Sequence, residues 1–194
     1  PITASTDQTS VTLDTTKPIL TIDTLISNNA KSFLAKSGDQ LTLNFTSNEK
    51  ILIPQVTLLG VDMDAVNASG NGLEWQVLVP ILDNTSNGLV DFQISFQDPT
   101  GNSDIKLCTS PTGYCGTSLN VDITSPTLTL VKLKSNNSDN TSLAKFGDTV
   151  TLEFDASESL ENPSVRINGI ETTVSYGSDT DWMATYSVPD YRVK

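Results

Sequence analysis

Short runs in which apolar and polar residues alternate dominate the pattern along this chain. Residues 40–46 place Leu41, Leu43 and Phe45 between polar neighbours, and residues 90–97 alternate in the same way. A period of two predicts strands with one buried face. No long helix is predicted. Further strands are predicted at residues 20–22, 56–58, 75–79, 105–108 and 118–121.

The same pattern occurs twice. Residues 27–60 and 135–169 both begin Ser-Asn-Asn and continue with Leu-Ala-Lys-x-Gly-Asp, an alternating run, a Glu and a Pro. Ser27 and Ser135 are 108 positions apart, and after a one-residue insertion Asp39 and Asp148 are 109 apart. A repeat of this length indicates tandem domains. In the second copy, strands are predicted at 128–130, 150–154, 165–167 and 182–188, with a type I′ turn at Asn168-Gly169.

The repeat predicts three parts of the chain. Residues 15–124 are predicted to be one complete unit. Residues 125–194 are predicted to be a second, truncated unit, because nothing in them matches residues 90–121. Residues 1–14 are interpreted as the last strand of a preceding unit, so we expect the segment to come from a longer chain. The joints between the parts are short and contain Pro, which predicts stiff junctions.

The order of these motifs resembles the bacterial-type Ig-like tandem repeats of large cell-surface and extracellular proteins. The resemblance is carried by an Asp-x-x-x-Pro joint, Ser-Asn-Asn, Lys-x-Gly-Asp, the Glu and Pro, Asn-Gly, Trp, and Asp98-Pro-Thr-Gly-Asn102. About seven short strands in ~100 residues predict an all-β fold of tandem Ig-like β-sandwich domains.

The resemblance implies an extracellular structural repeat at the cell surface: a spacer, a stalk or a subunit of a filament. Its implied partners are neighbouring Ig-like repeats of the same chain and copies of itself in a filament. A ligand-binding adhesin module is the alternative, and the excursion that carries Tyr114 is its candidate site.

The balance of acidic and basic residues limits the classes of partner that the chain is expected to bind. Acidic residues outnumber basic ones by 23 to 11, for a net charge of −12. This charge argues against nucleic acid or an anionic membrane surface as a partner and permits cations. No apolar run approaches the ~20 residues of a membrane-spanning helix, so no membrane insertion is expected.

No catalytic arrangement can be assembled from the sequence. The chain has no His, which excludes Ser-His-Asp and Cys-His arrangements. A carboxylate pair for glycoside hydrolysis is not excluded by composition, but no acidic residue stands in an unusual apolar context. The chain is therefore predicted not to be an enzyme, and no cofactor is required.

Cys108 and Cys115 enclose a loop that contains Pro and Gly. This closeness predicts a local disulfide in an oxidising compartment. Two free thiols or a metal site are the alternatives, although a metal site needs further soft ligands and the chain has no other Cys.

Five sequons match the acceptor motif for N-glycosylation. In a eukaryotic secreted protein all five could carry glycans, whereas in a bacterium they are ordinary turn residues. The two tryptophans, Trp75 and Trp182, are predicted to be core residues rather than sugar-stacking platforms. The acceptor residues are Asn44, Asn67, Asn84, Asn136 and Asn140.

The first joint is a candidate calcium site. If the strands run in Ig order, the loops that hold Glu49 and Asp98 lie at the end where the chain enters, beside Asp14. These three carboxylates, with the amide oxygen of Asn102, form the hard-oxygen set that Ca²⁺ prefers. Asp122 and Glu158 repeat part of the set. The alternative is that Asp and Asn form side-chain turns that need no metal.

Overall fold

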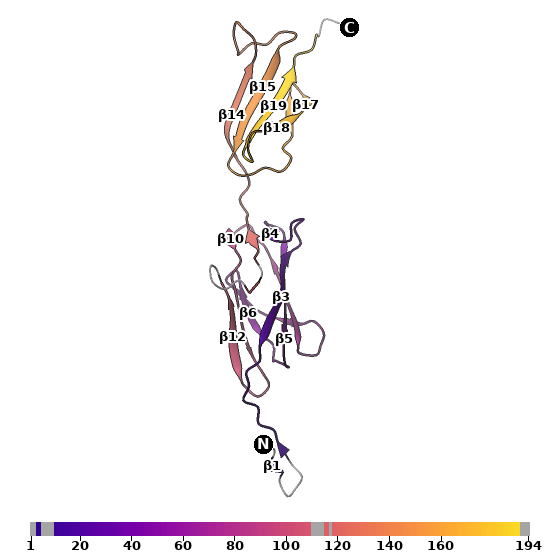
Figure 1. The fold of residues 1–194 in the computed structure, drawn as a ribbon, viewed down its shortest axis with the longest axis vertical. Coiled ribbons are helices and arrows are strands. Elements are labelled where there is room, and N and C mark those ends of the chain that lie inside the picture. The colour runs from indigo at the N-terminus through magenta and orange to yellow at the C-terminus, as the bar shows by residue number, and fades with distance from the viewer. Residues whose placement is uncertain (1–2, 5–9, 110–114, 117, 191–194) are drawn as a thin grey trace. The chain divides into compact units, whose positions relative to one another are not determined.

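The computed structural model describes residues 3–4, 10–109, 115–116 and 118–190. These residues form β-strands and contain no helix, so the all-β prediction is confirmed for this part of the chain. The chain divides into two compact units, Pro1–Thr124 and Ser125–Lys194, here called unit 1 and unit 2 (Figure 1).

A short strand pair precedes the main sheets of unit 1. β1 (Thr3–Ala4) and β2 (Ser10–Val11) run antiparallel and form a two-stranded sheet of their own. Residues 1–14, which were interpreted from the sequence as one last strand of a preceding unit, thus contain two short strands that pair with each other.

The first large sheet of unit 1 has four antiparallel strands in the order β3-β5-β9-β8. Its centre is β5, where the alternation predicted from sequence is observed: Leu41, Leu43 and Phe45 are buried, and the residues between them are partly exposed. The strands are β3 (Leu20–Ser27), β5 (Gln40–Ser47), β9 (Glu74–Pro80) and β8 (Val66–Asn67).

The second large sheet has the order β12-β11-β6-β7, also antiparallel. Phe92, Ile94 and Phe96 alternate on β11 and are buried, as the sequence predicted. The strands are β12 (Ser103–Cys108), β11 (Phe92–Gln97), β6 (Gln55–Leu58) and β7 (Val61–Asp64).

Three short strands form a further sheet in unit 1, which places residues 34–35 beside residues 120–121. β13 (Asn120–Val121) lies between β10 (Gly88–Leu89) and β4 (Leu34–Ala35), antiparallel to the first and parallel to the second. The backbone N–H groups of Asn120 and Asp122 donate to the carbonyls of Phe33 and Ala35 at 3.0 and 2.8 Å.

A single hydrophobic core lies between the two large sheets. It combines residues of β3, β5 and β9 with residues of β6 and β11, and it includes Trp75, which was predicted to be a core residue. Burial of one face of each sheet is the main source of stability for such a unit. The arrangement is consistent with a β-sandwich.

Unit 2 repeats part of this architecture. Its four-stranded sheet has the order β14-β15-β19-β18, and a two-stranded sheet pairs β16 with β17. Phe154 pairs with Trp182 as Phe45 pairs with Trp75 in unit 1, so the two tryptophans occupy equivalent positions in the two sheets. The strands are β14 (Leu128–Ser135), β15 (Thr149–Ala156), β19 (Asp181–Ser187), β18 (Val174–Tyr176), β16 (Val165–Ile167) and β17 (Ile170–Thr172).

The hairpin between β16 and β17 has the predicted turn. Ile167 pairs with Ile170, and the two residues between them have positive φ, 52° at Asn168 and 77° at Gly169. Positive φ at both central positions defines a type I′ turn, for which Asn-Gly is the preferred sequence.

The repeated Ser-Asn-Asn and Gly-Asp residues form a polar network that is the same in both units. In unit 1, the Asp39 carboxylate accepts hydrogen bonds from the side chain of Asn29 and the backbone N–H of Lys36, both at 2.8 Å. Its pKa is lowered, first by the Asn29 bond and then by the Lys36 bond. The neighbouring Asn28 side chain accepts from the N–H of Gln40 at 2.8 Å.

In unit 2, Asp148 accepts from Asn137 and from the N–H of Lys145, both at 2.9 Å. Asn136 accepts from the N–H of Thr149 at 2.8 Å. Gly147 has a φ of 86°, as does its counterpart Gly38 in unit 1, a conformation that favours glycine. The repeated motif therefore connects the end of β3 to the start of β5 in unit 1, and the end of β14 to the start of β15 in unit 2.

Candidate metal centre

The turn between β11 and β12 is organised by the side chain of Asp98, which is only 1% exposed. Its Oδ1 accepts hydrogen bonds from the backbone N–H groups of Thr100, Gly101 and Asn102 at 2.8, 2.7 and 2.9 Å. The Thr100 hydroxyl donates to the same oxygen at 2.8 Å. A buried carboxylate needs such partners, and the local sequence Asp-Pro-Thr-Gly-Asn supplies them.

Burial and hydrogen bonding act on Asp98 in opposite directions. Burial alone raises the pKa of a carboxyl group, because it disfavours the charged form. Here the hydrogen bonds from Asn102, Thr100 and Gly101 together outweigh burial and lower the pKa of Asp98 to about 2. Asp98 is therefore a carboxylate throughout the physiological pH range.

Asn102 connects this turn to the segment that enters unit 1. Its Nδ2 donates to Asp98 Oδ2 at 2.8 Å and to the backbone carbonyl of Asp14 at 3.3 Å. The Asp14 carboxylate in turn accepts from the N–H and the hydroxyl of Thr16 through Oδ1, at 3.0 and 2.7 Å. The sequence predicted that Asn102 offers its amide oxygen; the contacts that the structure gives to Asp98 and Asp14 are made by its NH₂ group.

Glu49 lies in the loop between β5 and β6. The Ser47 hydroxyl donates to the Glu49 backbone carbonyl at 2.5 Å and orders this loop. Among the described residues, none donates a hydrogen bond to the Glu49 carboxylate. Its pKa is raised, first by burial and then by repulsion from Asp14 and Asp98.

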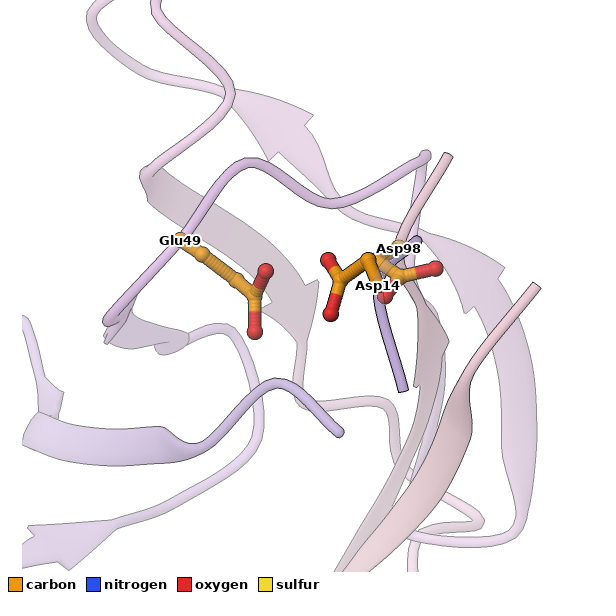
Figure 2. A group of neighbouring side chains, drawn as sticks. All are labelled: Asp14, Glu49 and Asp98. Atoms are coloured by element: carbon orange, nitrogen blue, oxygen red, sulfur yellow. The ribbon is translucent and has the colours of Figure 1, made fainter. Parts of the chain in front are cut away.

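The structure brings together the three carboxylates that the sequence singled out. One oxygen from each of Asp14, Glu49 and Asp98 lies within 4.8 Å of the others. Figure 2 shows the Glu49 side chain extended toward Asp14 and Asp98. Three negative charges at this separation repel one another, so a cation placed among them would relieve the repulsion.

The joint motif that contains Asp14 has a local counterpart at Asp122. Asp122 Oδ1 accepts from the N–H of Thr124 at 3.0 Å, as Asp14 Oδ1 does from Thr16. It also accepts from the side chain of Asn87 at 3.3 Å. Glu158, the other repeated acid, belongs to unit 2.

Cys108 and Cys115 lie at disulfide-bonding distance, with their Cα atoms 5.6 Å apart. The pairing is the one predicted, and Cys108 is fully buried in the unit 1 core. Tyr114, the candidate contact of an adhesin site, lies outside the described residues.

The five predicted glycosylation positions differ in their surroundings. Asn84, Asn136 and Asn140 are exposed, and Asn67 is half-buried on β8. Asn44 is also half-buried, and its amide bridges two neighbouring strands: it donates to Thr24 Oγ1 at 2.8 Å and accepts from Gln76 Nε2 at 2.9 Å.

Sequence reasoning did not find the residues that hold the acidic cluster in place. Thr16 and Thr100 orient Asp14 and Asp98, respectively. Each Thr follows its Asp by two positions, the spacing of a common side-chain turn, so the signal was present in the sequence.

The part of the chain that the structure describes has no helical segment that would fit across a bilayer. No protein-family model matches the chain, and no curated protein matches it significantly.

Proposed function

We propose that this chain is a non-catalytic, extracellular structural element of tandem Ig-like repeats, which acts as a spacer or stalk or as a subunit of a surface filament. Two sheets of orders β3-β5-β9-β8 and β12-β11-β6-β7 face one core, with the last strand parallel to β4. This strand order supports an Ig-like sandwich. The duplicated polar network supports the repeat, and the disulfide supports an oxidising compartment.

The observation that carries the proposal is the path of the chain through unit 1. Asp14, at the entry, is bonded to Asn102 beyond the end of β11. Asp122, at the exit, is bonded to Asn87, which precedes the start of β11. The chain therefore enters unit 1 at one end of its sheets and leaves at the other, as a unit in a load-bearing series requires.

Tension along the chain would load the pairing of β4 with β13 in shear. These strands are parallel, and β4 belongs to the entering part of the chain whereas β13 belongs to the leaving part. Pulling at the two ends slides them past each other, so their hydrogen bonds must break together. A spacer under load depends on such an arrangement.

Replacing Asp122 with Pro should lower the force at which unit 1 unfolds in single-molecule pulling. Pro removes the backbone N–H that donates to the Ala35 carbonyl. Asp122→Ala is the matched control, because it removes the carboxylate and keeps the N–H. Equal unfolding forces for the two variants, measured in chelator, would contradict a load-bearing role for this strand pair.

We also propose that Asp14, Glu49 and Asp98 bind calcium and stiffen the entry to unit 1. The support is the clustering of three oxygen donors, two of them held by local hydrogen bonds. Ca²⁺ takes six to eight oxygen ligands, so waters or backbone carbonyls would complete the shell.

Calcium should raise the melting temperature of unit 1 by several degrees. An extracellular module with a Kd of about 10⁻⁴ M is stabilised by about 1.4 kcal/mol at about 1 mM calcium. Glu49→Gln should abolish this response. It should also raise the melting temperature slightly in chelator, because it relieves the repulsion that raises the pKa of Glu49.

Asp64→Asn is the matched control for net charge. Asp64 is exposed on β7, does not belong to the cluster of three carboxylates, and accepts a hydrogen bond from Gln55. This variant should keep the full calcium response. A calcium shift of the same size in wild type and Glu49→Gln would rule out the proposed ligand set.

A further inference from the structure

The edge strands of the two large sheets in unit 1 differ in how well they are protected against pairing with another strand. Proteins shield the free backbone groups of an edge strand with short length, charges or bulges. β8 has only two residues, β7 carries Asp62 and Asp64, and β3 has a register shift between Ile22 and Thr24. Among the described residues, β12 pairs only with β11, and it is six residues long with a regular register. β12 is therefore the edge most open to a further strand.

The hydrogen bonds around β11 show which backbone groups of β12 point to the free edge. The N–H of Asp98 donates to the carbonyl of Asn102 at 3.0 Å, and hydrogen-bonded pairs alternate with non-hydrogen-bonded pairs from there along the ladder. Ile105 falls in a non-hydrogen-bonded pair, and its N–H donates instead to Oδ1 of Asp104 at 2.9 Å. The backbone groups that point away from β11 therefore belong to Ser103, Ile105 and Leu107.

The side chains of β12 form an outer and an inner row. Ile105 and Leu107 lie on the outer face of the sheet and are 58% and 55% exposed. Asp104 and Lys106 alternate with them and share the face of Cys108, which is buried in the core. A charge on the inner row of an edge strand opposes pairing, because the added strand would cover it. Pairing is therefore favourable only where the added strand brings the opposite charge to each of these two positions.

The sequence of β12 is complementary to itself in an antiparallel arrangement. When two copies are centred on Ile105, Asp104 of each copy lies opposite Lys106 of the other. A centre at Asp104 or at Lys106 would instead place like charges opposite each other. Asp104 is available for this contact, because its ion pair with Lys17, at 3.7 Å, is exposed and such pairs contribute little. Charge complementarity thus selects one register, and it selects a second copy of the chain as the partner.

We propose that β12 pairs with β12 of a second copy, antiparallel and centred on Ile105, and so joins two four-stranded sheets into one. Each Ile105 N–H exchanges its bond to Asp104 for one to the Ile105 carbonyl of the other copy. Each Leu107 N–H donates to the Ser103 carbonyl of the other copy. Asp104 and Lys106 then face each other in a non-hydrogen-bonded pair, in which opposite side chains are closest.

Two copies complete this contact, because the same residues serve on both sides and the symmetry closes. Cys115 lies beside the end of the free edge, with its Sγ 3.7 Å from the Leu107 carbonyl oxygen, so that oxygen is left out of the proposed ladder. The pairing goes beyond the proposed function: it joins chains side by side, and a chain that stays single would leave the role of a tandem spacer intact.

Sedimentation equilibrium of the full chain, from about 10 μM to about 1 mM, measures the association, a range suited to a small interface. The wild type should approach twice the mass of one chain. Asp104→Lys and Lys106→Asp each place like charges opposite one another at two positions, and each should weaken the association on the order of 10- to 100-fold. Mixed in equal amounts, the two variants should associate again, because each brings the charge that the other requires.

Two further variants serve as controls. Asp62→Lys makes the same change of charge on β7, the opposite edge of the same sheet, and should leave the association unchanged. Ile105→Pro removes an N–H that points to the free edge, a position where an edge strand tolerates Pro, and should abolish the association while the melting temperature of unit 1 stays near that of the wild type.

A wild type that remains a single chain at about 1 mM would overturn the proposal. So would an association that survives Asp104→Lys, which would place the contact on another surface. Failure of the two charge variants to associate when mixed would exclude the proposed register.

Discussion

Replacing Leu43 with Ala should lower the free energy of unfolding of unit 1 by about 2–5 kcal/mol, the range for removal of a buried leucine side chain. Leu43 is fully buried at the centre of β5, between Leu25 and Val77 on the neighbouring strands. Equilibrium denaturation of the full chain measures the loss.

The repeat provides a matched control for this substitution. Leu152 has the same register in β15, between Leu133 and Ala184, but it is only half-buried. Leu152→Ala should therefore destabilise unit 2 by clearly less than Leu43→Ala destabilises unit 1. Equal losses would mean that Leu152 is as fully covered in solution as Leu43.

Acid should weaken unit 1 through Asp98. The pKa of Asp98 is lowered from 3.8 to about 2 in the folded unit, where its hydrogen bonds outweigh burial. A group with a depressed folded pKa contributes stability above its unfolded pKa and loses it as the pH falls through the folded value. The contribution of Asp98 should therefore be complete above about pH 4 and decline toward pH 2.

Asp98→Asn should lower the stability of unit 1 at neutral pH and flatten its dependence on pH between about 4 and 2. In Asp98→Asn an NH₂ group replaces Oδ2. This group cannot accept the hydrogen bond from Asn102 Nδ2, so that bond is lost. Glu49 should have the opposite effect on the pH dependence of stability. Its pKa is raised in the folded unit, so protonation of Glu49 stabilises the fold as the pH falls. Denaturant unfolding at a series of pH values separates the two, and an unchanged slope in Asp98→Asn would contradict the assignment.

The central strands could be predicted from the sequence because burial alternates along them. Leu41, Leu43 and Phe45 show the pattern without interruption, and all three are buried. β7 was missed although Val61-Asp62-Met63-Asp64 alternates apolar and polar residues. The run is only four residues long and follows directly on the turn at Gly60, and so short an alternation is a weak signal.

The exposure of the unit 2 leucines could not be predicted from the alternation. Leu128 and Leu133 match Leu20 and Leu25 in type and position, so the pattern predicts the same burial. Burial depends on strands far away in sequence, and here the described residues supply no strand at the edge of β16 that faces away from β17.

The clustering of the three carboxylates could be predicted, because the order of the strands determines which loops lie together. Given Ig-like strand order, the loops with Glu49 and Asp98 meet the entering segment, and the structure places Asp14, Glu49 and Asp98 together. The orientation of the Asn102 amide was not predictable. It is set by acceptors on Asp98 and Asp14, 4 and 88 positions away.

The exposed leucines of unit 2 also bear on how unit 1 folds during synthesis. During synthesis β3, β5 and β9 of unit 1 leave the ribosome before β11 and β12. At that stage the strands that later cover Leu20 and Leu25 are not yet present. The counterparts Leu128 and Leu133 of unit 2 are 57% and 63% exposed. Such an intermediate can pair with a wrong strand. The Asn29–Asp39 hydrogen bond joins residues only 10 positions apart, so it can form without β11 and can fix the register of β3 and β5 early.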